Sequence, residues 1–176
     1  MSYLDVEAGE IFLTEEDGLS LRLAMHRGDA ADAFWTKDQF RLGEGFIGIV
    51  AETSKPLVTS ALQQDVRFLR RQVVNAGFQC LACIPLIAHG NVSGVMGIAT
   101  RKMQKLETRE VSLLTSIGTW AGTAIENLRL NQQGRRLAVL EERERIGMDL
   151  HDGIIQSIYA VGLALDYARM EVESNP

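Results

Sequence analysis

The chain has 176 residues, of which 46% are hydrophobic and 23% charged, enough for one hydrophobic core and a further element. A formal net charge of −5, with no basic cluster beyond Arg67, Arg70 and Arg71, argues against a nucleic-acid-binding protein. No apolar run reaches the roughly 18 residues of a membrane span and no signal peptide is evident, so we expect a cytoplasmic protein without membrane contact.

Two β-strands are predicted at the start of the chain. Apolar and polar residues alternate over residues 6–14 and 19–26, and Asp17-Gly18 between them is a turn signal, which indicates a β-hairpin. Residues 27–41 show no regular pattern. We expect a loop there that carries Phe34, Trp35 and Phe40.

Short elements are predicted next. Residues 46–53 predict a helix that ends before Lys55-Pro56, because the residue preceding a proline disfavours the helical conformation. Residues 57–60 predict a brief strand. Residues 65–75 predict a second helix, and Gly77 beyond it suits the left-handed conformation of a C-terminal cap.

A second hairpin and a long helix follow. Residues 79–88 and 92–101 predict two strands joined through residues 89–91. Thr108 is the expected N-cap of a helix whose apolar residues recur at heptad-like steps. These residues are Leu114, Ile117, Ala121, Ala124 and Leu128.

Strands paired through hairpins, with helices between them, indicate an α+β domain around a mainly antiparallel sheet. Three stretches carry a family resemblance: RLGEGFIGIVAETSKPL from Arg41, AGFQCLACIPL from Ala76 and NVSGVMGIA from Asn91. With them, about residues 4–130 resemble a GAF sensory domain. The resemblance implies a GAF-type sheet flanked by helices and a small-molecule pocket, whose ligand stays unknown.

Two short motifs have plain structural interpretations. Residues 43–48, GEGFIG, match the G-x-G-x-x-G dinucleotide pattern, but a loop precedes them and a short helix follows, which favours glycines of a tight turn. Residues 80–83, CLAC, form a C-x-x-C, yet residues three apart on a strand point to opposite faces, which favours core packing over a metal or redox pair. A redox or cofactor-linking role for Cys80 stays open, because GAF pockets lie near this strand.

Aromatic residues are the candidates for lining a pocket. Trp35, Phe40, Phe68 and Phe78, with Cys80 beside them, either line a ligand cavity or belong to the core. His26 and His89 are expected to face solvent. We expect no metal site and no cofactor held by this chain.

An amphipathic helix is predicted over residues 141–165. His151 falls at the margin of its apolar band, while Asp152 and Gln156 lie on the polar side. Taken alone, such a histidine is more often an ordinary edge residue. The band consists of residues at steps of three or four: Ile146, Leu150, Ile154, Ile158, Val161 and Leu165.

The residues around His151 carry a second resemblance. E-R-x-R-I opens the helix, His151-Asp152 lies in its middle and Gln156 follows Asp152 by four residues. The segment resembles the H-D-x-x-x-Q phosphoacceptor box of sensor histidine kinases of the nitrate/nitrite-sensor-like subfamily. The resemblance implies that His151 takes the γ-phosphoryl group of ATP and passes it to an aspartate of a response regulator. It also implies that Asp152 acts as the orienting base and that Gln156 positions a water for phosphatase activity.

The two resemblances together predict a domain organisation. We expect a GAF sensory domain over residues 1–130, a signalling connector over 131–140 and the first helix of a dimerisation and histidine-phosphotransfer domain over 141–176. The apolar band has no partner left in the chain and predicts a parallel homodimer. The ATP-binding motifs of a kinase catalytic domain do not occur here, so ATP and Mg²⁺ would be bound by another part of a longer parent kinase.

Two other functions remain as alternatives. The chain could be a stand-alone GAF module that binds a small molecule and only dimerises through its helix. It could also be an enzyme, since some GAF proteins reduce free methionine sulfoxide with cysteines. The divergent cysteine pair and the long appended helix argue against that second alternative.

Overall fold

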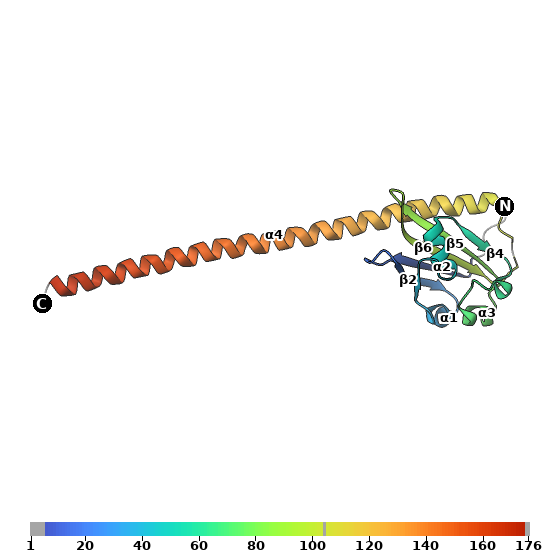
Figure 1. Cartoon of the computed structure of the whole chain (residues 1–176), viewed down its shortest axis with the longest axis horizontal. Helices are drawn as coiled ribbons and strands as arrows, with labels where there is room; N and C mark the ends of the chain where they lie inside the picture. The colour runs from blue at the N-terminus through green and yellow to red at the C-terminus, as the bar shows by residue number, and fades with distance from the viewer. Residues whose placement is uncertain (1–5, 104, 175–176) are drawn as a thin grey trace. The chain divides into compact units, whose positions relative to one another are not determined.

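A six-stranded antiparallel sheet forms the centre of the N-terminal part of the chain (Figure 1). The computed structural model describes residues 6–103 and 105–174, with side chains through residue 137 and beyond it at 139–146, 148 and 154. The strand order is β3-β2-β1-β6-β5-β4. The strands are β1 (Ala8–Thr14), β2 (Ser20–Gly28), β3 (Gln39–Arg41), β4 (Leu57–Thr59), β5 (Cys80–Ala88) and β6 (Asn91–Thr100). The expected α+β fold with an antiparallel sheet is confirmed.

Both predicted hairpins are present. In the β1–β2 turn, Gly18 adopts a positive φ of 66°, which a residue without a Cβ adopts without strain. His89 and Gly90 join β5 to β6 with φ values of 51° and 83°. Two successive left-handed residues are typical of a tight hairpin turn that matches the twist of the flanking strands.

One face of the sheet carries the hydrophobic core and three short helices. These helices are α1 (Ala31–Trp35), α2 (Gly45–Thr53) and α3 (Arg71–Asn75), with the 3-10 turn η1 (Leu62–Gln64) before α3. Alternate residues of the strands point into this core, as the period of two requires. Strands and helices contribute buried side chains that include Phe12, Leu23, Leu81, Val95, Phe34, Val50 and Val73.

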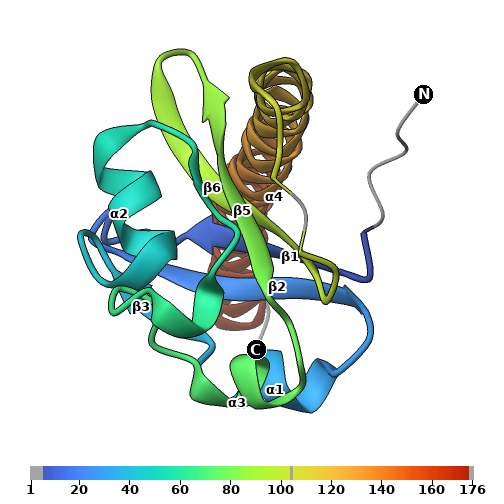
Figure 2. The same ribbon diagram turned by 90° about the vertical axis from the view of Figure 1, so that its right-hand side faces the viewer.

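The other face of the sheet is covered by the first turns of α4 (Thr108–Ser174). Figure 2, viewed from one end of the molecule, shows α2 and α4 on either side of β5 and β6. Gly118 and Gly122 of α4 lie directly against the backbone of β5, because a Cβ on either would come within 2.7 Å of a backbone atom of that strand. Leu114, one turn earlier, is buried.

The glycines of residues 43–48 make a tight turn, as expected. Gly43 and Gly45 adopt positive φ values of 76° and 61°. Gly48 lies so close to the preceding strand that a Cβ would meet the Arg41 carbonyl oxygen at 2.0 Å. The motif therefore lets α2 start immediately beside β3.

Three sequence predictions were wrong in their bounds. The segment 65–75 is helical only over Arg71–Asn75, because Arg70 turns inward to a partner on β1. The expected loop 27–41 contains α1 and β3. Glu107, not Thr108, precedes the first residue of α4, and its backbone N–H donates to the Glu110 carboxylate at 2.8 Å, as in a capping box.

The chain divides into two compact units, Met1–Leu128 and Arg129–Pro176. The described residues of the second unit, 129–174, are the remainder of α4. Its described apolar side chains, among them Leu137, Leu140 and Ile146, are exposed. Among the described residues, no helix has an apolar stretch long enough to cross a bilayer.

Candidate functional site

The five predicted pocket residues do not form one cluster. Phe40 on β3 and Phe78 before β5 are buried in the core on the α1–α3 face, where the partly buried Phe68 packs against it. Trp35, the last residue of α1, is 45% exposed. Cys80 lies on β5, where the alternation of side chains points it to the α4 face. Only the phenylalanines therefore lie together in the core.

The centre of the phenylalanine cluster is a charged pair that the sequence analysis did not identify. Arg70 and Glu10 are each only 2% exposed. The two terminal nitrogens of Arg70 donate to the two carboxylate oxygens of Glu10 over 2.7 and 2.6 Å. One of those nitrogens also donates to the Phe34 carbonyl oxygen at 3.2 Å. Such bidentate charge-assisted pairing is the strongest that an arginine makes.

Four aromatic rings surround the guanidinium of Arg70. The distances from its central carbon to the ring centroids are 5.2 Å for Phe34, 5.5 Å for Phe40 and 5.6 Å for both Phe12 and Phe68. These distances fall within the range of a cation–π interaction. We call the Glu10 carboxylate and these four rings the cation box.

A signal in the sequence could have located the cation box. Glu10 alternates with Ala8 and Phe12 on the buried face of β1, and a buried carboxylate requires a cation or several donors. The sequence shows Arg70 only as one of three nearby arginines, with Arg67 and Arg71. Its partner is 60 residues away in sequence, and no local pattern connects the two.

The cysteines do not form a reactive pair. Cys80 and Cys83 form no disulfide and are buried, and strand alternation places them on opposite faces of the sheet, as predicted. Burial raises the pKa of the Cys83 thiol, and the Glu10 carboxylate adds to the rise, so Cys83 stays protonated and unreactive. Beside Cys80 the cavity measures about 20 Å³, about the room that one water needs.

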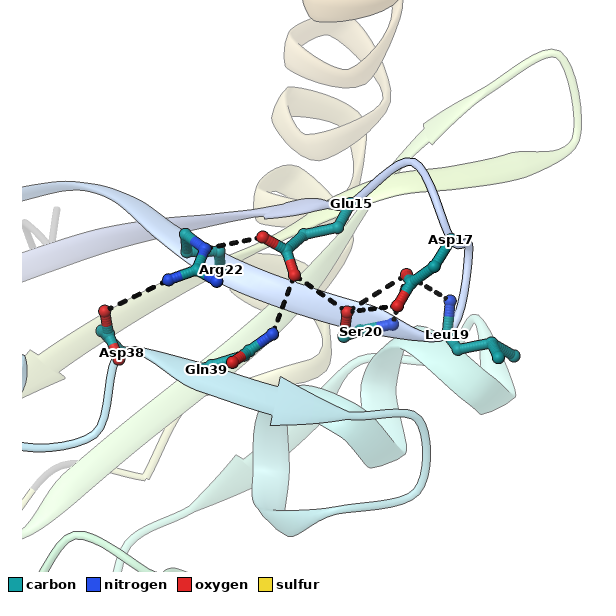
Figure 3. Close-up of polar contacts among 7 residues, drawn as sticks. All are labelled: Glu15, Asp17, Leu19, Ser20, Arg22, Asp38 and Gln39. Carbon is teal, nitrogen blue, oxygen red and sulfur yellow. Dashed lines mark hydrogen bonds and ion pairs between the residues drawn. The ribbon is translucent and has the colours of Figure 1, made fainter.

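A polar cluster at the β1–β2 turn is an alternative site, and Figure 3 shows its contacts. The Arg22 guanidinium and the Ser20 hydroxyl donate to Glu15 at 2.6 and 3.0 Å, and these bonds lower the pKa of the Glu15 carboxyl. Asp17 accepts from the Leu19 backbone N–H at 2.9 Å. Both carboxylates therefore accept hydrogen bonds within the turn and the neighbouring strands, which gives the cluster a structural role.

The histidines of the first unit have different surroundings. His89 is exposed in its turn, as expected. His26 is half-buried and its ring lies 4.7 Å from that of Phe34, so the expectation of a solvent-facing residue was wrong. No group of three metal-ligating side chains occurs among the described residues.

His151, Asp152 and Gln156 belong to the helix α4. Their side chains lie outside the described part of the structure. Their roles as phosphoacceptor, base and phosphatase residue therefore stay predictions.

Comparisons with known proteins assign families to the two parts of the chain. The family model of the GAF domain matches residues 1–126, and a model described as histidine kinase matches residues 142–176. The two matches agree with the two resemblances in the sequence.

The chain is also similar to individual proteins and to solved structures. The sensor histidine kinase YhcY of Bacillus subtilis is 26% identical over 96% of this chain, and the nitrogen fixation protein AnfA of Azotobacter vinelandii is 32% identical over 59%. The chain spans 46% and 22% of the length of these two relatives. The GAF domain of a phosphoenolpyruvate-protein phosphotransferase from Coxiella burnetii superposes with a TM-score of 0.63 at 17% identity, covering 73% of this chain and 76% of that one.

Proposed function

The chain belongs to the GAF domain family and continues into a histidine kinase segment, and we propose that it couples a ligand-binding unit to a phosphoacceptor histidine. In this proposal the GAF unit binds a small molecule and controls the phosphorylation of His151. His151 then passes the phosphoryl group to an aspartate of a response regulator. The activity belongs to a kinase that also supplies an ATP- and Mg²⁺-binding domain.

The observation that carries this proposal is the continuity of α4, which is a single helix from Thr108 to Ser174. Its first turns pack on β5 through Gly118 and Gly122, and the histidine kinase match begins at residue 142 of the same helix. Small shifts of packed helices are an established way to carry a signal. A change in the GAF core that alters the packing of α4 on β5 would therefore be transmitted along the helix to His151.

The residue types suit the chemistry. A neutral imidazole is a good nucleophile near pH 7, and it forms a phosphorus–nitrogen bond that is labile enough for onward transfer. Asp152, the next residue, carries a carboxylate that can accept the imidazole proton as the phosphoryl group arrives.

An exposed apolar face in the first turns of α4 supports a homodimer. Leu113, Ile117 and Trp120 follow one another at steps of four and three, on the side of the helix away from Gly118. Trp120 is 83% exposed. Apolar residues on one stripe of a long helix favour a partner helix, and a second copy of the chain presents the same stripe.

The cytoplasm is the compartment that this function requires, because ATP and response regulators are found there. The two buried cysteines are not joined in a disulfide, which agrees with a reducing compartment.

Phosphorylation in trans tests the proposal. The chain is mixed with a separately produced histidine kinase catalytic domain, Mg²⁺ and radiolabelled ATP, and acid-labile label on the chain is measured. We expect labelling of the wild type and of His89→Gln, whose histidine lies in an exposed turn, and no labelling of His151→Gln. Label that persists in His151→Gln would refute the assignment of the phosphoacceptor.

A further inference from the structure

The cation box has the composition of a receptor for an organic cation. It consists of one buried carboxylate, Glu10, and four phenylalanine rings that face the charge at 5.2–5.6 Å. A carboxylate supplies charge and directed hydrogen bonds, while aromatic faces attract the flat or alkylated parts of a cation. In the structure the chain's own Arg70 occupies the box.

The carboxylate of the box is held rigidly. Glu10 lies in the middle of β1, which is hydrogen-bonded to β2 on one side and to β6 on the other. Gly97 on β6 leaves the space for the carboxylate, since a Cβ there would lie 2.7 Å from an oxygen of Glu10. Moving Glu10 would require the centre of the sheet to change.

The guanidinium is attached to a less constrained part of the chain. Arg70 ends an irregular stretch between η1 and α3, in which Val66 is 92% and Leu69 45% exposed. Its described contacts include a local bond from the Phe68 N–H to the Asp65 carbonyl at 3.0 Å and the packing of the Phe68 ring edge-on against Phe46, with ring centroids 5.8 Å apart. None of its residues belongs to the sheet. Of the two charged partners, Arg70 is therefore the one that can leave.

The fit of Arg70 in the box is incomplete. Its Nε–H is buried and has no hydrogen-bond partner. A buried donor without a partner weakens the hold on a guanidinium, because the bond it made to water is not replaced. A free cation is not tied to a backbone and can orient its donors and its alkyl groups independently.

We propose that the cation box is a binding site for a small organic cation of the guanidinium or alkylammonium class, and that Arg70 occupies it as an internal stand-in when no ligand is bound. Binding expels the Arg70 side chain. The backbone follows, because the Arg70 carbonyl accepts the Val73 N–H at the start of α3. This extends the sensory role proposed above by naming a ligand class, and its test measures binding, so that it can fail independently of phosphorylation.

Two other interpretations make different predictions. A small anion could bind to Arg70, but it would have to replace the fixed carboxylate of Glu10. A purely structural ion pair would bind no ligand at all. The rigid anion and the movable cation favour a cationic ligand over both.

The test uses n-propylguanidine, with neutral n-propylurea of the same shape as the matched control. Binding is followed by calorimetry on the whole chain. We expect the wild type to bind propylguanidine weakly and Arg70→Ala to bind it at least about tenfold more tightly, because the internal competitor is gone. Arg70→Ala with Glu10→Gln should not bind it, and propylurea should bind to none of the three.

Amide hydrogen exchange on the wild type provides a second measurement. Propylguanidine should speed exchange over residues 65–70, and propylurea should not. If Arg70→Ala does not fold alone, propylguanidine should restore its folding while propylurea fails.

Three results would overturn the proposal. They are equal binding of the guanidine and the urea, unchanged exchange over residues 65–70 at saturating propylguanidine, and an affinity that Arg70→Ala does not increase. Binding of propionate to the wild type that disappears in Arg70→Ala would assign the site to anions instead.

Discussion

Gly118 of α4 lies so close to β5 that a Cβ added to it would meet the Pro85 carbonyl oxygen at 2.7 Å and the side chain of Ile84 at 2.9 Å. A carbonyl in the middle of a strand cannot move aside without disturbing the sheet. The absence of a side chain at this position therefore sets the distance between α4 and the sheet.

We predict that Gly118→Ala destabilises the GAF unit. Overpacking against backbone costs about 1–3 kcal/mol, whereas Ala gains up to about 1 kcal/mol over Gly in helix propensity. The expected net loss in free energy of unfolding is about 1–2 kcal/mol, measured by urea denaturation. The matched control is Gly134→Ala in the same helix, where an added Cβ has no atom within 4 Å. Gly134→Ala should not lower the free energy of unfolding. Equal losses in both variants would contradict the close packing of α4 against β5.

The ion pair between Glu10 and Arg70 gives a prediction about coupling. Glu10→Gln leaves the Arg70 charge buried without its counterion, which costs about 3–5 kcal/mol of unfolding free energy. The double variant Glu10→Leu with Arg70→Met removes both charges. It should lose clearly less free energy of unfolding than Glu10→Gln. Urea unfolding of the two component single variants, Glu10→Leu and Arg70→Met, and of the double variant measures the coupling energy. Additive losses would mean that the two groups do not act as a pair.

The regular parts of the fold could be predicted from the sequence because their signals are local. The two hairpins show alternation with Asp17-Gly18 and His89-Gly90 at their turns, and both are present in the structure. The helix α2 and its glycine turn depend on residues within a few positions of one another. Boundaries set by such neighbours were accurate to within one or two residues.

The cation box could not be predicted because its partners meet only in three dimensions. The segment 65–70 has helix-compatible residues, but the bonds from Arg70 to Glu10 and to the Phe34 carbonyl draw the backbone away from a helix. Phe40 and Phe68 were proposed as pocket residues on aromatic character alone. They surround an arginine instead of an empty cavity, because Arg70 binds Glu10, which is 60 residues away in the sequence.

The acid sensitivity of the fold should depend on Glu7. Its pKa is lowered from the ordinary 4.5, first by the bond from the Arg101 backbone N–H, and further by the Thr100 hydroxyl and the Arg101 guanidinium. Since the pKa is lower in the folded state, ionised Glu7 stabilises the fold above about pH 4.5, and this contribution is lost as the pH falls through the lowered value.

Glu7→Gln should therefore reduce stability at pH 7 and leave a shallower loss of stability below about pH 4.5 than in the wild type. Thermal unfolding across this pH range measures both effects. Glu16→Gln in the exposed β1–β2 turn is the control and should follow the wild-type curve. Parallel curves for the wild type and Glu7→Gln would show that Glu7 does not contribute to the acid transition.

The exposed stripe on α4 predicts how the dimer can be weakened. Trp120→Glu places a charge in the middle of the Leu113, Ile117 and Trp120 stripe, and loss of a central aromatic typically costs 2 kcal/mol or more, about a 30-fold weaker dimer. Light scattering over a concentration series measures the change. Trp35→Glu alters the other tryptophan, on α1, and should leave the dimer intact. A wild-type chain that is monomeric at a protein concentration on the order of tens of micromolar would contradict the dimer.

The final prediction separates the roles of Asp152 and Gln156. Asp152 is adjacent to His151 and can accept its proton, and general-base assistance is worth about 10²–10⁴ in rate. Gln156 has no useful pKa. It follows His151 by five residues, about one and a half helical turns, and so points elsewhere around the helix. Its amide can instead hold a water in line with an aspartyl phosphate of a docked response regulator.

In the full-length kinase, Asp152→Asn should suppress autophosphorylation of His151 by a factor within that range. Gln156→Ala should leave autophosphorylation unchanged and slow the dephosphorylation of the response regulator, because the attacking water loses its orientation. Both activities are measured on both variants, with purified phosphorylated regulator as the substrate of the second assay. Exposed surface residues without a role would leave both activities at wild-type rates. If Gln156→Ala instead abolishes phosphorylation and spares dephosphorylation, the two roles are assigned to the wrong residues.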